Sequence, residues 1–396
     1  MPLDEIARRS YGKLVAYLAA RTRDVAAAED ALSEAFAEAL AHWPVQGVPA
    51  NPEAWLLTVA RRKTIDMLRA RQRHENAIRD GLEAAASETE IPDQRLGLLF
   101  ACAHPAIEES IRAPLMLQVV LGLNAERIAP AFLASPAAMG KRLVRAKEKI
   151  RQAGIPFRVP GRDELAGRLE TVLEAIYAAF TEGWTDPGGA DAARRDLAEE
   201  ALFLARLVTE LLPDEAEALG LLALMLHAEA RRTARRDGSG EFVPLASQDR
   251  TLWDWRMIVE AEESLRRASA LGAIGRYQLE AALQSAHVSR CHTGRGNWAE
   301  VVQLYDALIA LTGSPVAAVN RSLVVAEVHG ADAGLDALDA VAADARLAEY
   351  QPYWAARAEL LARTGAHDEA QRAYEMAIGL ERDPAVRRFL QRRRDE

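Results

Sequence analysis

Residues 55–73 read WLLTVARRKTIDMLRARQR, a stretch without glycine or proline that contains one acid, Asp66, and several bases. The bases are Arg61, Arg62, Lys63, Arg69, Arg71 and Arg73. Asn51 and Pro52 come just before it, and this pair is typical of a helix N-cap followed by proline in the first helical position. Three of the arginines are spaced seven and four residues apart, so they share one stripe of the predicted helix. The stretch therefore predicts a helix with one packing face and one cationic face.

The cationic stretch is unexpected because the 396-residue chain has a formal net charge of −9. Residues 1–160 contain 22 Lys and Arg against 19 Asp and Glu, whereas residues 161–396 contain 27 against 39. All five lysines lie in the first part. This asymmetry suggests a front part that faces nucleic acid and an acidic remainder with another role.

The composition favours an all-α fold. The chain is 50% hydrophobic and only 6% aromatic, and it is rich in Ala, Leu, Arg and Glu, as packed amphipathic helices are. Its length suits two or three domains. No apolar run approaches the roughly 18 residues of a membrane span, and the N-terminus has no apolar signal region. With only two cysteines, far apart, no framework of disulfides is expected. We therefore expect a cytoplasmic protein without membrane contact.

An acidic helix is predicted upstream of the basic one. In residues 24–43, DVAAAEDALSEAFAEALAHW, apolar residues recur every four positions, and acids lie on the other faces. The apolar residues are Ala28, Leu32, Phe36 and Leu40, and the acids are Glu29, Asp30, Glu34 and Glu38. Residues 43–52, WPVQGVPANP, predict a loop between the two helices.

A second basic helix follows an acidic linker at residues 79–94. Ser135 is its expected cap and Pro136 its first residue, and it runs to Arg151. Together with the preceding helix it gives a helix-turn-helix pattern over residues 122–154, with the second helix as the candidate groove reader. Gly140, inside this helix, costs about 1 kcal/mol relative to Ala, and we interpret it as a position where another backbone comes close.

Beyond residues 154–164 the pattern is one of helical hairpins. Residues 353–380 read as a helix, a turn at Gly365 and a second helix, which resembles one tetratricopeptide unit. Residues 297–330 predict a more diverged helical pair, and residues 231–253 predict an ordered loop. Several polar or aromatic residues of this part are candidates for a groove that binds a peptide, a protein or a small signal, or else for buried structural networks. They are Gln248, Asp249, Arg250, Trp253, Tyr277, Gln278, Asn320 and Arg321.

Enzyme motifs are missing from the sequence. It contains no GxxxxGK[ST], no dinucleotide fingerprint after a strand, no HExxH and no GxSxG. Cys102 and His104 have C-x-H spacing, but two ligands without partners do not make a zinc site, and a buried cysteine explains Cys102 better. We therefore expect no catalysis, no metal and no cofactor.

The order of these segments resembles the extracytoplasmic-function sigma factors of RNA polymerase. The acidic helix and the Trp-bearing basic helix resemble region 2, and the helix-turn-helix pattern resembles region 4. The linker and the long helical tail resemble a subgroup with a tetratricopeptide-like C-terminal extension. The similarity covers essentially the whole chain, and the order of the segments is specific although no single motif is.

The resemblance implies four segments. Residues 1–78 would be region 2, a helical bundle that binds core polymerase and the −10 element, and residues 79–94 the acidic linker. Residues 95–157 would be region 4, which binds the −35 element through its helix-turn-helix. Residues 165–396 would be a tetratricopeptide-like regulatory domain of helical hairpins that binds an unidentified protein or ligand.

The resemblance also implies contacts for named residues. By match, Asp30 and Glu34 dock on the clamp helices of the polymerase β′ subunit, and the β flap is a further polymerase contact. The −10 element would be bound by Arg61, Arg62, Lys63, Arg69 and Arg73. The family pattern Ala-Arg-Asn is here Ala-Arg-Arg, so the −10 sequence does not follow. The −35 element would be bound by Ala137, Ala138, Lys141, Arg142 and Arg145, although Lys141 and Arg145 could equally grip phosphates.

These inferences lead to one function and one alternative. We expect an alternative sigma factor that directs promoter-specific transcription initiation, with its activity modulated by the C-terminal helices. The alternative is a tetratricopeptide-type adaptor or anti-activator that retains a sigma-like polymerase-binding core.

Overall fold

The protein is seen in a computed structural model that describes residues 3–71, 93–129, 132, 134–184, 192–294 and 296–396. Over these ranges the chain forms α-helices and short 3-10 turns, and its one β-type pairing is an isolated bridge between Arg236 and Phe242. The all-α prediction is confirmed. The chain divides into two compact units, unit 1 (Met1–Gly183 and Ala193–Leu204) and unit 2 (Trp184–Ala192 and Ala205–Glu396). No helix in the described ranges is long and apolar enough to cross a membrane.

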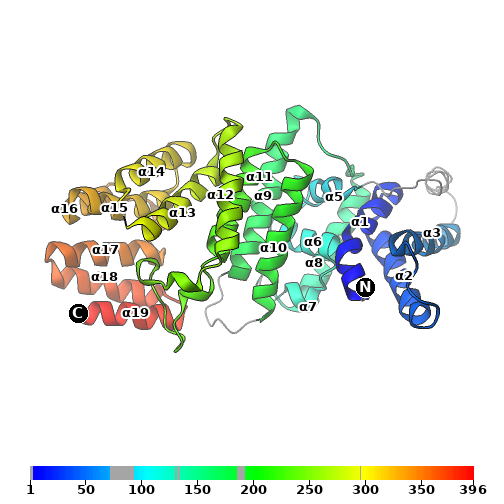
Figure 1. Ribbon diagram of the computed structural model, residues 1–396, viewed down its shortest axis with the longest axis horizontal. Coiled ribbons are helices and arrows are strands. Elements are labelled where there is room, and N and C mark those ends of the chain that lie inside the picture. The colour runs from blue at the N-terminus through cyan, green and yellow to red at the C-terminus, as the bar shows by residue number, and fades with distance from the viewer. Residues whose placement is uncertain (1–2, 72–92, 130–131, 133, 185–191, 295) are drawn as a thin grey trace. The chain divides into compact units, whose positions relative to one another are not determined.

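Unit 1 begins with three helices, α1 (Leu3–Thr22), α2 (Val25–Gln46) and α3 (Pro52–Arg71), drawn in blue in Figure 1. Each packs against the other two. The break between α1 and α2 is made by Asp24, whose side chain accepts a hydrogen bond from the Ala27 amide at 3.0 Å. Asn51 caps α3 in the same way, through the Ala54 amide at 3.0 Å, and the predicted start of the basic helix is confirmed.

The loop between α2 and α3 is shorter than predicted. The helix α2 continues through Pro44 to Gln46, so the expected start of the loop at residue 43 was wrong. Proline removes the hydrogen bond to the carbonyl four residues back and its ring crowds that carbonyl, and this local cost is tolerable where the helix ends within the same turn. The Gly47 amide then bonds to the Trp43 carbonyl at 2.9 Å, and the positive φ of Gly47, 85°, ends the helix.

The next helices of unit 1 are α5 (Arg95–Cys102), α6 (Glu109–Leu121), α7 (Ala125–Ile128), α8 (Pro136–Gln152) and α9 (Arg162–Trp184). The Ser135 hydroxyl caps α8 by accepting from the Ala138 amide at 3.2 Å, and Pro136 lies in the first turn, as predicted. The helix α1 contacts α5 and α6, and α2 contacts α8. The helices α5, α6 and α8 therefore pack directly on α1 or α2.

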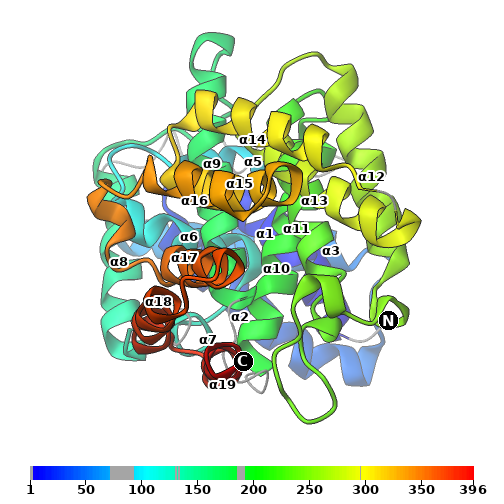
Figure 2. The same ribbon diagram turned by 90° about the vertical axis from the view of Figure 1, so that its left-hand side faces the viewer.

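Unit 2 contains the end of α10 (Ala192–Leu211) and a series of antiparallel helices. They are α11 (Ala216–Glu229), α12 (Trp255–Ala270), α13 (Arg276–Thr293), α14 (Trp298–Thr312), α15 (Pro315–His329), α16 (Ala331–Asp339), α17 (Gln351–Thr364), α18 (His367–Leu380) and α19 (Pro384–Asp395). The helical pairs predicted for residues 297–330 and 353–380 are confirmed as α14–α15 and α17–α18, the second with Gly365 at φ 82° in its turn. Figure 2 shows α17, α18 and α19 side by side.

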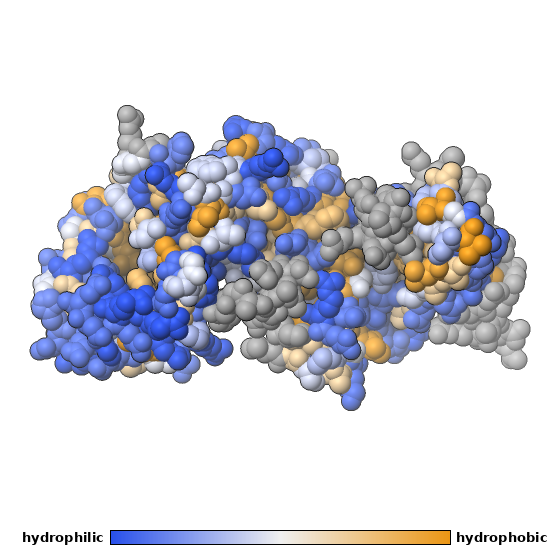
Figure 3. Space-filling model, turned by 60° about the horizontal axis from the view of Figure 1, so that its bottom comes forward, coloured by the Kyte–Doolittle hydropathy of each residue, from blue (hydrophilic) through white to orange (hydrophobic). Residues whose placement is uncertain are grey.

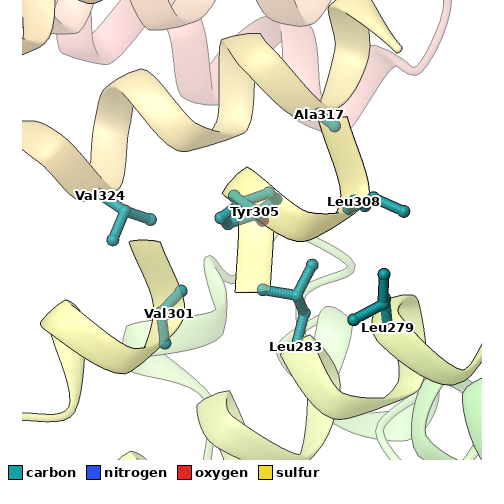
Figure 4. Close-up of a cluster of buried hydrophobic side chains, with 7 residues drawn as sticks. All are labelled: Leu279, Leu283, Val301, Tyr305, Leu308, Ala317 and Val324. Atoms are coloured by element: carbon teal, nitrogen blue, oxygen red, sulfur yellow. The ribbon is translucent and has the colours of Figure 1, made fainter. Parts of the chain in front are cut away.

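Buried clusters join successive helices of unit 2. One of them brings together side chains from α13, α14 and α15 around the Tyr305 ring (Figure 4). Its members are Leu279, Leu283, Val301, Tyr305, Leu308, Ala317 and Val324. A second cluster joins α17, α18 and α19 in the same way, so the pairs α14–α15 and α17–α18 each share their buried apolar side chains with a third helix.

The segment at residues 231–253 is ordered, as predicted, because it is tied to the last helix. The Glu241 carboxylate accepts from Arg388 at 2.6 Å and from Arg392 at 2.9 Å, and Arg236 pairs with Asp383 at 2.5 Å. The rings of Phe242 and Phe389 pack edge to face, with centroids 5.5 Å apart. Figure 3 shows a largely hydrophilic surface at its left-hand side, the side on which α17, α18 and α19 are drawn in Figure 1.

The helix α11 buries an imidazole completely. His227 is 0% exposed, and burial lowers its pKa from 6.5 to about 4. The Glu262 carboxylate lies 3.4 Å from His227 Nε2, but neither ring nitrogen has a hydrogen-bond partner in the described residues. Desolvation therefore outweighs the nearby carboxylate, and the ring is neutral at pH 7.

Acidification should destabilise the protein through His227. Between pH 6.5 and 4, His227 is protonated in the unfolded chain but stays neutral in the folded chain. Lowering the pH through this window therefore lowers the free energy of unfolding, by up to about 3 kcal/mol. His227→Leu should make the loss shallower. Urea unfolding at pH 7.0, 5.5 and 4.5 measures how the free energy of unfolding of each protein changes with pH. The same pH dependence in variant and wild type would show that His227 is not the group responsible.

Replacing two helical glycines, Gly140 and Gly220, by alanine should have opposite effects on the stability of the protein. A Cβ at Gly140 would meet only the Ala125 Cβ, at 3.9 Å, so the interpretation of Gly140 as a close backbone approach was wrong. Gly140→Ala should therefore stabilise the protein by about 1 kcal/mol. A Cβ at Gly220 would lie 2.6 Å from the Gln278 backbone nitrogen. Gly220→Ala should cost about 1–3 kcal/mol. Thermal unfolding checks both, and a lower Tm for Gly140→Ala would contradict the first.

Candidate polymerase and nucleic-acid interfaces

The two acids predicted to contact a protein partner lie one turn apart on α2, and both are exposed. Asp30 lines a cavity of about 380 Å³ together with residues of α8, among them Glu148 and Arg151. Glu34 lies 3.1 Å from the Lys63 amine of α3. The two carboxylates thus share a helix face but have different neighbours.

Lys63 bridges two acids of α2. Its amine lies 3.1 Å from both Glu38 and Glu34, and hydrogen bonds to these carboxylates raise the pKa of Lys63. A residue predicted to bind DNA is therefore paired with one predicted to bind protein. Exposed pairs of this kind are weak, so either group can exchange its partner for a better one.

Arg61 and Arg62 are adjacent in sequence but point in different directions. The Arg61 guanidinium donates to the Tyr17 hydroxyl at 2.5 Å and lies 5.2 Å from the centre of that ring. Arg62 is exposed. Of these two arginines, Arg62 is the one available to an external anion. The Arg69 side chain and all of Arg73 fall outside what the structure describes.

The second basic helix, α8, is cationic on one face only. Its buried face consists of Met139, Leu143, Ala146 and Ile150. Ala137, Ala138, Lys141 and Arg145 lie together on the exposed face. Arg142 is half-buried, because its guanidinium donates to the Ser110 hydroxyl of α6 at 2.6 Å and lies 3.6 Å from Glu108. Four of the five residues predicted to bind DNA thus lie together on the exposed face of α8, and the fifth, Arg142, is hydrogen-bonded to α6.

A buried ion pair between α2 and α8 was not predicted. Lys147 Nζ lies 2.7 Å from Glu29 Oε2, with the side chains only 12% and 11% exposed. Burial raises the pKa of Glu29 and Lys147 opposes this shift. Tyr11 of α1 is also hydrogen-bonded to Glu29, and burial with this carboxylate raises the pKa of Tyr11. The prediction that placed Glu29 on a polar face of its helix was wrong, and only its position beside Ala28 hinted at burial.

The candidate residues of the tail divide into three neighbourhoods of unit 2. In the first, Gln248 donates to the Val243 carbonyl at 3.4 Å, Arg250 bonds to the Cys291 carbonyl, and Trp253 is buried beside Ile258. Asp249 caps a 3-10 turn, and hydrogen bonds from Thr251 lower the pKa of Asp249.

The second neighbourhood contains Tyr277 and Gln278, the third contains Asn320 and Arg321, and each makes hydrogen bonds within unit 2. Tyr277 and Gln278 are buried at the start of α13, where their amides both donate to the Glu217 carboxylate at 3.0 Å. Arg321 donates to Asp306 at 2.6 Å, and Asn320 is half-buried beside it on α15. Local structural roles therefore account for most of these residues, and a shared groove stays a prediction.

No metal-binding group of three or more His, Cys, Asp or Glu side chains occurs among the described residues. Cys102 is fully buried, and burial raises the pKa of its thiol. The prediction of a buried cysteine is thus confirmed.

Two segments of the chain match known protein families. Residues 6–74 match the sigma-70 region 2 family, a family of non-enzymatic transcription factors. Residues 168–269 match a family of unknown function, DUF6596. The chain is 36% identical to a protein of Rhizobium meliloti (strain 1021), described as uncharacterized, over 387 residues that cover 94% of this chain and 89% of the relative. No solved structure matches the chain significantly.

The contrast between Arg61 and Arg62 predicts different effects on stability. Arg61→Ala removes a hydrogen bond and a cation–π contact, so it should lower the free energy of unfolding by about 1–2 kcal/mol. Arg62→Ala should change it by less than about 0.5 kcal/mol, as exposed substitutions do. Urea unfolding of the two variants measures both, and equal effects would contradict the placement of Arg61.

Proposed function

The chain belongs to the same family as the Rhizobium meliloti protein and carries a sigma-70 region 2 domain, and we propose from this premise that it is an alternative sigma factor with a regulatory C-terminal part. The sigma-70 region 2 match supports a role in transcription initiation, with core RNA polymerase and promoter DNA as partners. This match is the observation that carries the proposal. The finer assignments below are proposals that rest on the residues and their surroundings.

The polymerase contact is assigned to the acidic face of α2. Asp30 and Glu34 are exposed one turn apart, so they can meet basic residues of a partner helix together. Complementary charge of this kind guides encounter and fixes orientation. The partner in this proposal is the pair of clamp helices of the β′ subunit, and the β flap provides a further contact.

The −10 contact is assigned to the cationic face of α3. Arg62 is exposed there and can bind backbone phosphate, and Lys63 can do so by exchanging its two carboxylates for phosphate. Arg61 acts through Tyr17 to hold the helix in place. Arg69 and Arg73 continue the same stripe of the sequence.

The −35 contact is assigned to the exposed face of α8. A helix capped by Ser135 presents the small side chains of Ala137 and Ala138 at its N-terminal end, where a recognition helix meets base edges. Lys141 and Arg145 follow on the same face and can hold phosphates. Arg142 reaches DNA in this proposal only after it leaves Ser110.

The C-terminal helices are assigned a modulating role. They place most of their marked polar groups in structural contacts, which suits an interaction scaffold better than a catalytic site. The alternative is an adaptor or anti-activator that binds polymerase through region 2 without initiating transcription. The two differ in one observable, the formation of promoter-specific transcripts.

Run-off transcription tests the proposal. Full-length protein and core polymerase are incubated with a DNA fragment library that includes the sequence upstream of the gene itself. Specific transcripts should appear with wild type and decline at least tenfold with Asp30→Lys and Glu34→Lys combined, because reversed charge repels the polymerase. Glu375→Lys, exposed on α18, is the matched charge control. Polymerase binding without any transcript would favour the adaptor, and undiminished transcription by the double variant would refute the contact assignment.

A further inference from the structure

Four polar side chains of unit 2 gather between the end of α11 and one face of α13. They are Arg231, which follows α11, and Gln284, His287 and Arg290 of α13, and we call them the α11–α13 cluster. The three residues of α13 are spaced three apart, so their side chains are neighbours on the helix surface. All four side chains are half-buried, so a small ligand can reach them from solvent.

Hydrogen bonds within the cluster use up its acceptors. Arg231 Nε donates to the His227 carbonyl at 3.0 Å, and Arg231 Nη2 donates to the side-chain oxygen of Gln284. Arg290 Nη2 donates to His287 Nδ1, 3.1 Å away, because a guanidinium can only donate. The polar groups left over are N–H groups, on the Gln284 amide, on His287 Nε2 and on Nη1 of both arginines.

The cluster carries positive charge in a place that water reaches poorly. Burial lowers the pKa of Arg231 and of Arg290. Burial, together with these two guanidinium groups, lowers the pKa of His287 to about 4, so its ring is neutral at pH 7 and its hydrogen lies on Nε2. Arg290 Nη1 is itself buried and has no hydrogen-bond partner among the described residues. The Arg290 guanidinium lies over the Trp298 ring, 3.7 Å from its centre.

Carboxylates near the cluster are paired with other arginines. Arg232 lies 2.7 Å from Glu229. Glu327 raises the pKa of Arg290, against the effect of burial, but it is paired with Arg363 at 2.6 Å. The α11–α13 cluster itself contains no carboxylate. Poorly hydrated charges without a counter-charge destabilise a fold, so an anion from outside would be favoured here.

The arrangement of donors favours a phosphate group over a carboxylate. One guanidinium fork is enough to bind a planar carboxylate through two hydrogen bonds. Here two guanidinium groups come from two helices, and an imidazole and an amide add further donors. A tetrahedral group with two negative charges and several acceptor oxygens matches such a set better. Residues 161–396 contain 27 Lys and Arg against 39 Asp and Glu, so a long polyanion such as nucleic acid would be repelled.

We propose that the α11–α13 cluster binds the phosphate group of a small molecule, either a phosphate monoester or free phosphate. Arg231 and Arg290 supply the opposite charge, and His287 Nε2 and the Gln284 amide donate further hydrogen bonds. The Trp298 ring holds the Arg290 guanidinium in place. This inference goes beyond the proposed function and does not depend on it, because the cluster contains none of the residues assigned to polymerase or DNA.

Calorimetric titration of the full-length protein tests the site. Inorganic phosphate, glycerol phosphate and acetate are titrated separately at constant ionic strength into protein prepared without phosphate or sulfate. Inorganic phosphate or glycerol phosphate should bind one to one with a Kd of about 1 mM or below, and acetate at least about tenfold more weakly. Tighter binding of glycerol phosphate would assign the site to monoesters, and tighter binding of inorganic phosphate to the free ion. Failure of both to bind would overturn the proposal.

Matched variants locate the binding. Arg231→Gln and Arg290→Gln should each weaken phosphate binding at least about tenfold, because each removes a charged donor. Arg256→Gln removes an exposed arginine of α12 and should weaken it less than about twofold. Undiminished binding by the first two variants, or an equal loss in all three, would overturn the assignment to the cluster.

Chemical labelling of wild type decides the location even if these variants do not fold. Phenylglyoxal modifies accessible arginines, and mass spectrometry of peptides gives the rate at each one. Phosphate at about ten times its Kd leaves roughly a tenth of the sites free, so labelling of Arg290 should slow at least about threefold. Arg256 should be labelled at the same rate with and without phosphate. An unchanged rate at Arg290 would overturn the site, and none of these measurements requires polymerase.

Discussion

The burial of one carboxylate, Glu29, is the constraint on which the arrangement of unit 1 depends. An ionised carboxylate that is 11% exposed loses most of its hydration and must recover it from partners. Lys147 supplies the charge and Tyr11 a hydrogen bond, and these come from two other helices. Three helices are thereby fixed around one side chain, so the close contact of Gly12 with α6 lies beside a polar centre rather than a purely apolar one.

Local features of the fold could be predicted from the sequence, and non-local ones could not. The caps at Asn51 and Ser135 and the turn at Gly365 depend on neighbouring residues alone. Leu40 shows where the apolar recurrence every four residues in α2 stops predicting burial. Steps of four residues turn 40° further than a full helical turn, so after three steps from Ala28 the side chain has rotated by about 120°. Leu40 is accordingly 63% exposed, whereas Ala28 is fully buried.

The residues of the candidate site likewise fall into those set by one helix, which could be predicted, and those set by distant partners, which could not. The exposed row on α8 follows from the amphipathic spacing of a single helix, so the sequence was sufficient to group Ala137, Ala138, Lys141 and Arg145. The position of Arg61 depends on Tyr17, 44 residues away, and no spacing rule relates the two. The burial of Glu29 depends on Lys147, 118 residues away. Charge pairs between distant segments determine which cations of this chain remain available to a ligand.

The tie between residues 236–242 and α19 has a consequence for how unit 2 folds. Arrays of helical pairs usually have short-range contacts, so their repeats can fold one after another from any starting point. Here the Arg236–Asp383 and Glu241–Arg388 pairs join positions 147 residues apart. Contacts of such high sequence separation raise the contact order and slow folding, because a long loop must close before they form. Unit 2 should accordingly complete its folding only when the last helix of the chain has been synthesised.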